Sequence, residues 1–233
     1  MKMIDIEKNK QADVKESGTP VMVWDLPTRL FHWILVFLVI ISFVTGHTGG
    51  TAMDLHMQSG YAILVLLLFR LIWGWIGSHT SRFSFFVKGP KTVIQYATAL
   101  LKKDSPQYLG HNPMGGWSII ALLATLMIQV ITGLFANDDI LTEGPLYIWV
   151  SKSTSDWLTG IHEANQGLIT LLVALHVLAV FFYFFYKKEN LIRPMITGVK
   201  QWHKNTTELS SVGMWRAVGV MAAATFAVYL LVR

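Results

Sequence analysis

Long apolar runs alternate with polar, charged connections along the chain, and their lengths predict helices that cross a membrane. A crossing helix needs roughly 20 mostly apolar residues. Five segments approach this length, and they are Leu30–Gly46, His56–Gly77, Gly116–Phe135, Ile161–Tyr186 and Met214–Val232. The first run is short, but Trp24 and Trp33 can anchor it at the membrane interface. The pattern therefore predicts an all-α membrane protein with five spans.

Composition supports a membrane protein and narrows its chemistry. Hydrophobic residues make up 53% of the 233 residues and charged residues only 14%, whereas about a quarter of a typical soluble domain is charged. The chain contains no cysteine, which excludes disulfides, iron–sulfur clusters and covalently attached c-type haem. Any metal chemistry must therefore use histidine, methionine or carboxylate side chains.

The placement of lysine and arginine predicts the orientation of the spans. The connections 1–29, 78–114 and 187–213 hold fifteen of these residues, whereas 47–55 and 136–160 hold only Lys152. Because basic connections stay in the cytoplasm, we expect a cytoplasmic amino terminus and a carboxy terminus on the outer side. Residues 1–20 are polar and charged without an apolar core, so we interpret them as a flexible cytoplasmic tail and not as a signal peptide.

The outer side is acidic. Six carboxylates lie in or beside the outer connections, and they are Asp54, Asp138, Asp139, Glu143, Asp156 and Glu163. The net charge of +5 therefore conceals two oppositely charged faces, and we expect no nucleic-acid binding. The basic face suits anionic lipid, and the acidic face suits a basic soluble partner.

Two histidines in the fourth span indicate the function. His162 and His176 are fourteen residues apart, which is close to four full turns and puts them on one helix face about 21 Å apart. A single mononuclear site cannot use both, so they belong to two sites at different depths. His32 lies near the inner end of the first span and His56 at the outer end of the second. The alternating directions of the spans therefore pair His32 with His176 and His56 with His162.

Two opposed histidine pairs without cysteine are typical of noncovalent, low-spin haem b. Each iron would take one imidazole nitrogen from either side, and the apolar ring would fill the interior of the bundle. Four glycines in the spans offer room for the ring faces, and they are Gly46, Gly60, Gly133 and Gly167. Arg70 lies fourteen residues after His56 and so reaches the inner depth, where we expect it to bind a haem propionate.

Other interpretations of the histidines are less favoured. A single histidine in a span can simply hydrogen-bond a neighbouring helix, but four at matched depths are hard to explain in this way. A zinc site needs close-spaced ligands, which a fourteen-residue step does not provide. His47 competes with His56 for the outer site, but the turn GHTGGTAMD predicts that His47 lies in a loop.

Five segments carry a resemblance to a known family, and they are VWDLPTRLFHW, LHMQSGYAILVLLLFRLIWGWIG, GHNPMGGWS, ITGLFANDDI and HVLAVFFYFFYKKENLIRPMITG. Together they resemble the bacterial cytochrome b561 and nickel-hydrogenase b-type cytochrome family over about residues 21–200. The resemblance implies a four-helix transmembrane bundle that holds two b haems. The axial ligands that it implies are His32, His56, His162 and His176. Residues 201–233 then form a linker and a fifth helix beyond the four-helix core.

Members of that family pass electrons between the quinone pool of the bacterial inner membrane and a redox partner, so transmembrane electron transfer is the function we expect. The polar segment QYLGHNPMGG lies at the inner entrance of the third span. There Tyr108, His111 and Asn112 can exchange protons or hydrogen bonds, and we interpret them as quinone candidates. The alternative is that Asn112 only starts the helix and His111 binds a propionate or a phosphate.

The outer partner that we expect is a periplasmic c-type cytochrome or oxidoreductase subunit docked on the acidic face. The chain is then an electron-transfer cytochrome or a subunit of a quinone-linked oxidoreductase, and a homo-oligomer is compatible with the sequence. Three alternatives stay open. One is a superoxide:quinone oxidoreductase, although the outer carboxylates would repel this anion. The others are the membrane anchor of a nickel–iron hydrogenase and a haem-free transporter, although no inverted repeat is visible.

Overall fold

The computed structural model describes residues 18–102, 106–203 and 212–233. Five of the described helices are long and apolar enough to cross a membrane, which confirms the five predicted spans. They are α2 (Leu26–Thr48), α3 (Met53–Ile76), α6 (Pro113–Gly133), α7 (Lys152–Phe185) and α9 (Met214–Val232). The chain is therefore a multi-pass membrane protein. Residues 1–17 of the expected tail and 204–211 of the expected linker lie outside the described residues.

Helices extend beyond their apolar runs where a polar residue caps the helix end. The helix α7 begins at Lys152, whereas the apolar run begins at Ile161. It does so because Ser151 caps the helix, with its hydroxyl accepting the Thr154 N–H at 3.2 Å. Hydropathy registers only the apolar middle of a span, so it places such ends too far inside the helix.

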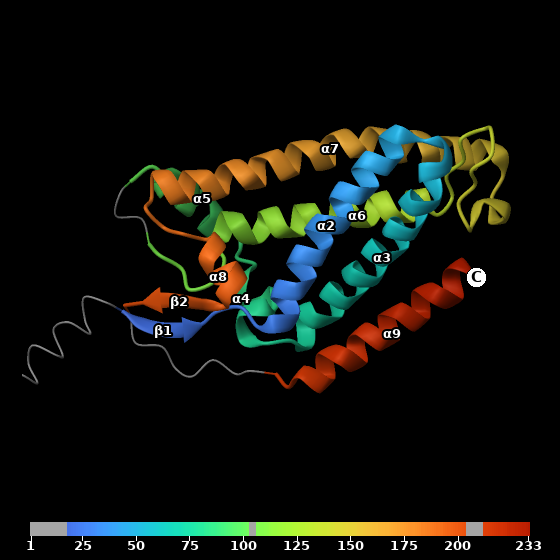
Figure 1. Ribbon diagram of the computed structural model, residues 1–233. Helices are drawn as coiled ribbons and strands as arrows, with labels where there is room; N and C mark the ends of the chain where they lie inside the picture. The colour runs from blue at the N-terminus through green and yellow to red at the C-terminus, as the bar shows by residue number, and fades with distance from the viewer. Residues whose placement is uncertain (1–17, 103–105, 204–211) are drawn as a thin grey trace, which may run out of the picture.

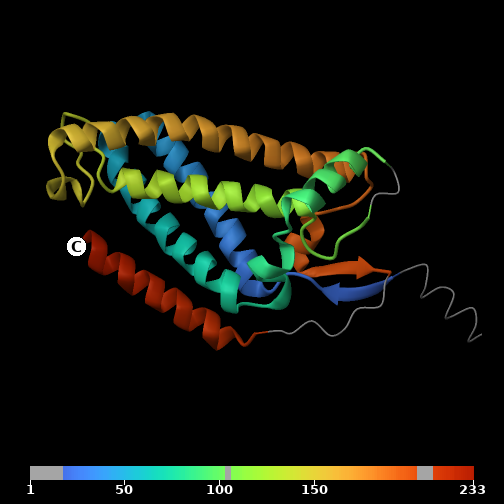
Figure 2. The ribbon, with the colours of Figure 1, turned by 180° about the vertical axis from the view of Figure 1, so that it is seen from behind.

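The helices α2, α3, α6 and α7 form two hairpins that meet through α3 and α6 (Figure 1). Within the hairpins, α2 packs along α3 and α6 packs along α7. The fifth long helix, α9, lies along α3 on the outside of the bundle, as both views show (Figures 1 and 2). The shorter helices are η1 (Gly50–Ala52), η2 (His79–Ser81), α4 (Phe83–Phe86), α5 (Pro90–Ala99), η3 (Tyr147–Trp149) and α8 (Ile192–Thr197).

The two ends of the bundle differ in their connections. One end holds α4, α5, α8 and the strands, and we call it the basic end after the lysines and arginines of its connections (Figure 1). The opposite end holds the turn between α2 and α3 and the connection 134–151, and we call it the acidic end (Figure 1).

A two-stranded antiparallel sheet lies at the basic end. Strand β1 (Thr19–Met22) pairs with β2 (Val199–Trp202), so that Thr19 lies opposite Trp202. The sequence predicts a loose tail up to residue 20 and a linker from residue 201, and the sheet crosses both of these boundaries. Strands of four residues whose partners lie up to 183 residues away along the chain leave no periodic signal in a sequence.

Gly198 makes the turn that brings the two strands together. Its φ of 85° is in the left-handed region, which glycine adopts without strain. Its carbonyl oxygen accepts the N–H groups of Val23 and Trp24 at 2.7 and 3.1 Å. The segment before α2 is therefore tied to the segment after α7.

The helix α3 buries more residues than any other described helix. Nine of its residues are buried, and Trp73 has no exposed surface. Trp73 stacks on Phe69 with ring centroids 5.6 Å apart, and its Nε1–H donates to Asp25 Oδ2 at 3.0 Å. By contrast, many large apolar side chains of α2 and α7 are exposed, as expected for helices that face lipid.

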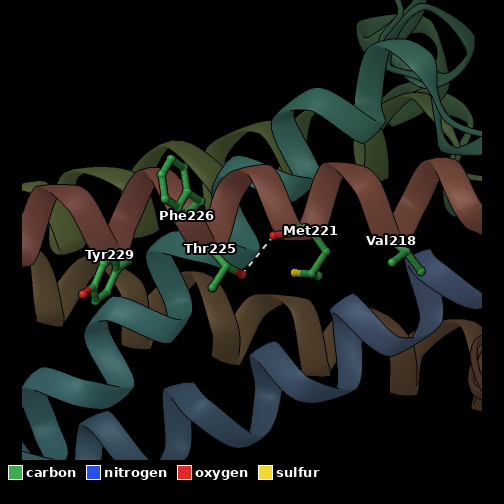
Figure 3. A pocket seen from close by; sticks show the side chains of 6 residues that line it. Val218, Met221, Thr225, Phe226 and Tyr229 are labelled. Carbon is green, nitrogen blue, oxygen red and sulfur yellow. Dashed lines mark hydrogen bonds between the residues drawn. The ribbon is translucent and has the colours of Figure 1, made fainter.

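The helix α9 carries an apolar hollow on one face. The lining residues are Val218, Met221, Ala222, Thr225, Phe226 and Tyr229 (Figure 3). The Thr225 hydroxyl donates to the Met221 carbonyl oxygen at 2.9 Å (Figure 3), so its hydrogen bond is satisfied within the helix. All of these residues belong to α9, a helix without histidine, so the candidate redox chemistry lies elsewhere.

Candidate functional site

The four histidines singled out in the sequence form two pairs in the structure. His32 of α2 and His176 of α7 lie toward the basic end, with ring centroids 6.5 Å apart. His56 of α3 and His162 of α7 lie toward the acidic end, with ring centroids 6.2 Å apart. All four side chains are partly buried. The structure therefore brings together the same pairs that the directions of the spans join.

The spacing of each pair fits a metal ion held between two imidazoles. A metal–imidazole bond of about 2 Å on each side, with about 1.2 Å from nitrogen to ring centre, gives roughly 6.4 Å between centroids. The observed 6.5 and 6.2 Å agree with this value. Among the described residues, no group of three or more histidines or carboxylates could hold a metal ion. Each pair could therefore supply two ligands to a metal ion that takes its other ligands from elsewhere.

Backbone carbonyls orient both imidazoles of the acidic-end pair. His56 Nδ1 lies 2.8 Å from the Ser42 carbonyl oxygen of α2, and His162 Nδ1 lies 2.9 Å from the Gln129 carbonyl oxygen of α6. A carbonyl oxygen can only accept, so each Nδ1 carries the proton and donates it. Nε2 of each ring is then unprotonated and able to bind a metal, as is usual for metal-binding histidines.

Two glycines make room for these imidazoles. A Cβ added at Gly46 would lie 2.9 Å from His56 Cε1, and one added at Gly133 would lie 2.8 Å from His162 Cε1. The nearest neighbours of both glycines in the structure are therefore the imidazoles. That Gly46 and Gly133 also make room for a haem face stays a prediction. At Gly60 and Gly167, the other two glycines expected at ring faces, an added Cβ would have no neighbour within 4 Å among the described residues.

The basic-end pair is held differently. His32 Nδ1 is buried and has no hydrogen-bond partner among the described residues. No hydrogen bond joins the His176 ring to any residue that the structure describes. The His32 ring packs edge-on against Trp33, with centroids 4.9 Å apart. The two pairs therefore share a spacing but differ in hydrogen bonding.

The prediction that His47 lies in a loop is wrong. His47 is in the last turn of α2, and its Nδ1 lies 2.8 Å from the Phe43 carbonyl oxygen. The helix continues to Thr48 and is capped by Gly49, whose φ is 64°. The paired glycines of the turn therefore come after His47. His47 is exposed and lies outside both pairs, whereas His56 faces His162.

Arg70 makes protein contacts near the basic end. The residue is only 3% exposed, and its Nη1 donates to the Ser81 carbonyl oxygen at 2.9 Å. Its guanidinium lies 5.1 Å from the ring centroid of Phe83 and 5.8 Å from that of Phe86. These contacts hold the connection after α3 against the bundle. Binding of a propionate by Arg70 stays a prediction.

Two of the three quinone candidates make contacts with tyrosines. Asn112 starts α6 by accepting the Gly115 N–H at 2.8 Å, and its amide donates to the Tyr183 hydroxyl at 2.8 Å. The Tyr108 ring packs against Tyr96 with centroids 5.5 Å apart. Asn112 therefore has a structural role as a helix cap, and its remaining amide group joins a polar cluster.

His111, the third quinone candidate, has a buried ring nitrogen without a hydrogen bond among the described residues. Its ring packs against Trp24 and Phe86, with centroids 4.6 and 5.0 Å apart, and its Nδ1 has no hydrogen-bond partner among the described residues. Burial, followed by the charges of Arg70 and of the basic-end histidines, lowers the pKa of His111 to about 3. The ring is therefore neutral at pH 7.

The sequence does not predict the polar contacts that surround these candidates. The hydroxyls of Tyr96 and Tyr183 lie 2.7 Å apart and join α5 to the end of α7. Lys200 Nζ donates to Glu189 Oε1 and to the Tyr108 carbonyl oxygen, each at 2.6 Å. The tyrosine pair and the Lys200–Tyr108 contact join residues that are far apart along the chain, and no spacing or motif signals them.

The family of this chain follows from comparison with known proteins. The family described as prokaryotic cytochrome b561 matches residues 23–198. The chain belongs to this family. It is therefore a haem-binding b-type cytochrome of membrane electron transport, which confirms both the resemblance and the class of function that it implies.

Relatives of this cytochrome b carry hydrogenase names. A probable Ni/Fe-hydrogenase B-type cytochrome subunit of Bradyrhizobium diazoefficiens is 24% identical over 221 residues, covering 79% of this chain and 88% of the relative. A probable Ni/Fe-hydrogenase 1 B-type cytochrome subunit of Escherichia coli K12 is 23% identical over 218 residues, covering 78% and 91%. No solved structure matches the chain significantly.

At the acidic end of this cytochrome b, several carboxylates already have partners. Lys152 Nζ lies 2.5 Å from Asp139 Oδ1 and 2.5 Å from Asp156 Oδ1. Asp138 Oδ1 accepts three backbone N–H groups at 2.8 to 2.9 Å, from Ile140, Leu141 and Thr142. The predicted acidic face is thus partly neutralised and partly used to fold its own loop.

We expect an Asp138→Ala substitution to loosen this loop. The three N–H bonds lower the pKa of Asp138 below its usual range, so the carboxylate stabilises the loop at neutral pH. A lowered folded-state pKa gives stabilisation that is lost as the pH falls through that pKa. Limited proteolysis at neutral pH should therefore cleave Asp138→Ala faster than the wild type within residues 137–143. Asp138→Asn keeps an acceptor oxygen and serves as the control. Equal cleavage of Asp138→Ala and the wild type would contradict this role.

Proposed function

We propose that this cytochrome b holds two haem b groups and carries electrons across the membrane between the quinone pool and a periplasmic redox partner. The observation that carries the proposal is the two facing histidine pairs, 6.5 and 6.2 Å between centroids, toward opposite ends of the bundle. His32 and His176 would hold one haem, and His56 and His162 the other. Family membership supports haem b as the cofactor.

In this proposal the protein binds, orients and insulates its cofactors. Haem b supplies a one-electron couple when it is bound. Donation from His56 and His162 to backbone carbonyls fixes two of the rings and leaves their Nε2 atoms unprotonated and able to bind iron. The apolar helices exclude water, which favours uncharged imidazoles. Two sites in one bundle then give electrons a path through an insulating bilayer.

We propose that the basic end faces the cytoplasm and the acidic end faces the periplasm of a bacterial inner membrane. The distribution of lysine and arginine supports this orientation, because basic connections are retained on the cytoplasmic side. The carboxy terminus after α9 then lies on the periplasmic side.

The quinone site that we propose lies at the basic end around His111. A neutral imidazole has one donor and one acceptor nitrogen, and Nδ1 of His111 is buried without a partner among the described residues. In the tautomer that carries its proton on Nδ1, His111 can therefore donate to a quinone oxygen without first breaking a protein hydrogen bond. Asn112 and Tyr108 flank it, and the Asn112 amide already contacts the Tyr183 hydroxyl.

A His111→Ala substitution tests this site. We expect quinone-coupled turnover to fall at least tenfold, because a positioned proton-exchanging group typically contributes about 10²–10⁴-fold, while the haem content stays as in the wild type. His79→Ala is the matched control, because His79 is an exposed histidine at the same end. Unchanged turnover in His111→Ala with full haem content would rule out the proposed role.

The periplasmic partner that we propose is a redox subunit bound at the acidic end. The names of the relatives as hydrogenase B-type cytochrome subunits support a partner enzyme held at the membrane. Leu141 and Trp149 are 93% and 77% exposed there, and exposed apolar side chains beside acids suit a protein contact. A basic soluble c-type cytochrome is the alternative, and its binding should weaken steeply as salt rises.

A further inference from the structure

The two hairpins hold their acidic-end histidines with the same short segment. Residues 42–46 of α2 read SFVTG, and residues 129–133 of α6 read QVITG. In each segment the first carbonyl oxygen accepts Nδ1–H of a histidine on another long helix, at 2.8 and 2.9 Å. The threonine hydroxyl donates chiefly to the carbonyl oxygen one residue earlier, that of Ile41 or Ile128, at 2.7 Å. It also lies 3.3 Å (Thr45) or 3.1 Å (Thr132) from the carbonyl oxygen that accepts the histidine.

The glycine that ends each segment completes the arrangement. A Cβ added at Gly46 would lie less than 3 Å from the His56 ring, and one added at Gly133 would lie less than 3 Å from the His162 ring. Each imidazole is therefore confined between a carbonyl acceptor and a glycine one turn later on the same helix. Both halves of the chain contribute one such histidine to the same pair, whose ring centroids are 6.2 Å apart.

The basic-end pair lacks this arrangement. His32 Nδ1 has no acceptor among the described residues, and its neighbour along α2 is Arg29, one turn earlier. At the acidic end, the carboxylate of Glu163 directly follows His162 in α7. The two pairs thus differ both in hydrogen bonding and in the sign of the nearby charges.

Both differences act on a bound iron in the same direction. An Nδ1–H donated to a carbonyl increases the basicity of Nε2, and a stronger donor stabilises the oxidised, more positive iron. Nearby carboxylates also favour the more positive state, whereas a nearby guanidinium disfavours it. Hydrogen bonding and electrostatics are among the protein's means of setting a haem potential.

We propose that residues 42–46 and 129–133 are positioning segments that give the acidic-end haem the lower of two reduction potentials. The proposal rests on the two bis-histidine haems of the proposed function. Electrons that enter at the acidic end would then pass to a site of higher potential at the basic end, next to His111. The two segments act through His56 and His162 and do not themselves touch the iron.

Potentiometric titration of the haem absorption band in the purified, full-length holoprotein tests this order. The wild type should titrate in two components. Gly46→Ala and Gly133→Ala lie on different helices, yet both should raise or abolish the lower-potential component and leave the higher one unmoved. Gly160→Ala is the control, because it lies on α7 near His162 and an added Cβ there meets nothing within 4 Å. It should move neither component.

Three results would overturn the inference. They are a single component from two haems, a shift of the higher-potential component by either glycine variant, or shifts of different components by the two variants. If both glycine variants lose all haem, His176→Ala decides the order, because it should remove the higher-potential component and would contradict the order by removing the lower. A wild type with fewer than two haems would instead refute the proposed function.

Discussion

His176→Ala should leave this cytochrome b with one haem per chain, the haem at the acidic end. Removal of the imidazole leaves His32 as the only protein ligand of the basic-end pair, whose rings lie 6.5 Å apart in the wild type. Mutation of a residue that hydrogen-bonds a metal ligand typically weakens metal binding about 10–100-fold. Loss of an axial ligand itself should weaken haem binding by more than this. The pair formed by His56 and His162 is hydrogen-bonded to other helices and should persist. Haem content by pyridine haemochromogen, divided by protein concentration, measures the effect.

Two further variants complete this experiment. His162→Ala should remove the acidic-end haem and leave the basic-end one, so the two single variants should retain spectrally different haems. His47→Ala is the control, because His47 is exposed and outside both pairs, and it should keep the wild-type haem content. Retention of the full haem content by His176→Ala would contradict the assignment of this ligand.

Trp73→Ala should give the largest loss of fold stability. Trp73 has no exposed surface, stacks on Phe69 and donates to the carboxylate that caps α2. Truncation of a fully buried tryptophan leaves a cavity and typically costs about 3–5 kcal/mol. The substitution also removes the Nε1–H donor to Asp25 Oδ2. That oxygen then keeps its hydrogen bond from the Ser81 hydroxyl, at 3.4 Å. Unfolding in detergent, followed by circular dichroism, measures the change in the free energy of unfolding.

The same helix offers a matched control for Trp73. Trp75 is 71% exposed, and its replacement by alanine should change the free energy of unfolding by about 0.5 kcal/mol or less. Trp73→Phe keeps an aromatic ring but loses the donor, so its cost should lie between these two values, at about 1–3 kcal/mol. Equal stabilities of Trp73→Ala and Trp75→Ala would show that α3 is not packed as described.

The sequence predicts the long helices because a bilayer imposes a simple length requirement on apolar runs. It also predicts which histidines meet, since alternating span directions fix the depth of each residue. The helix ends are less predictable, because polar caps such as Ser151 extend α7 well before its apolar run. For the same reason the sequence predicts a loop at His47, although α2 continues to Thr48.

Most contacts between distant segments, unlike the histidine pairs, have no signal in a single sequence. The pairing of β1 with β2 and the bond between Tyr96 and Tyr183 depend on how the bundle closes. The contacts of Gly46 and Gly133 are of the same kind, since only the packed helices show that an imidazole lies against each glycine. The repeated threonine–glycine pair was visible in the sequence, but its meaning depends on where the preceding carbonyls point.

The most direct test of the central claim is the number of haems bound by the purified, membrane-inserted protein produced with an ample haem supply. Two facing histidine pairs predict two noncovalent haem b groups per chain, both extractable into acidic solvent because the chain has no cysteine. A correctly inserted protein that contains one haem, or none, would contradict the account.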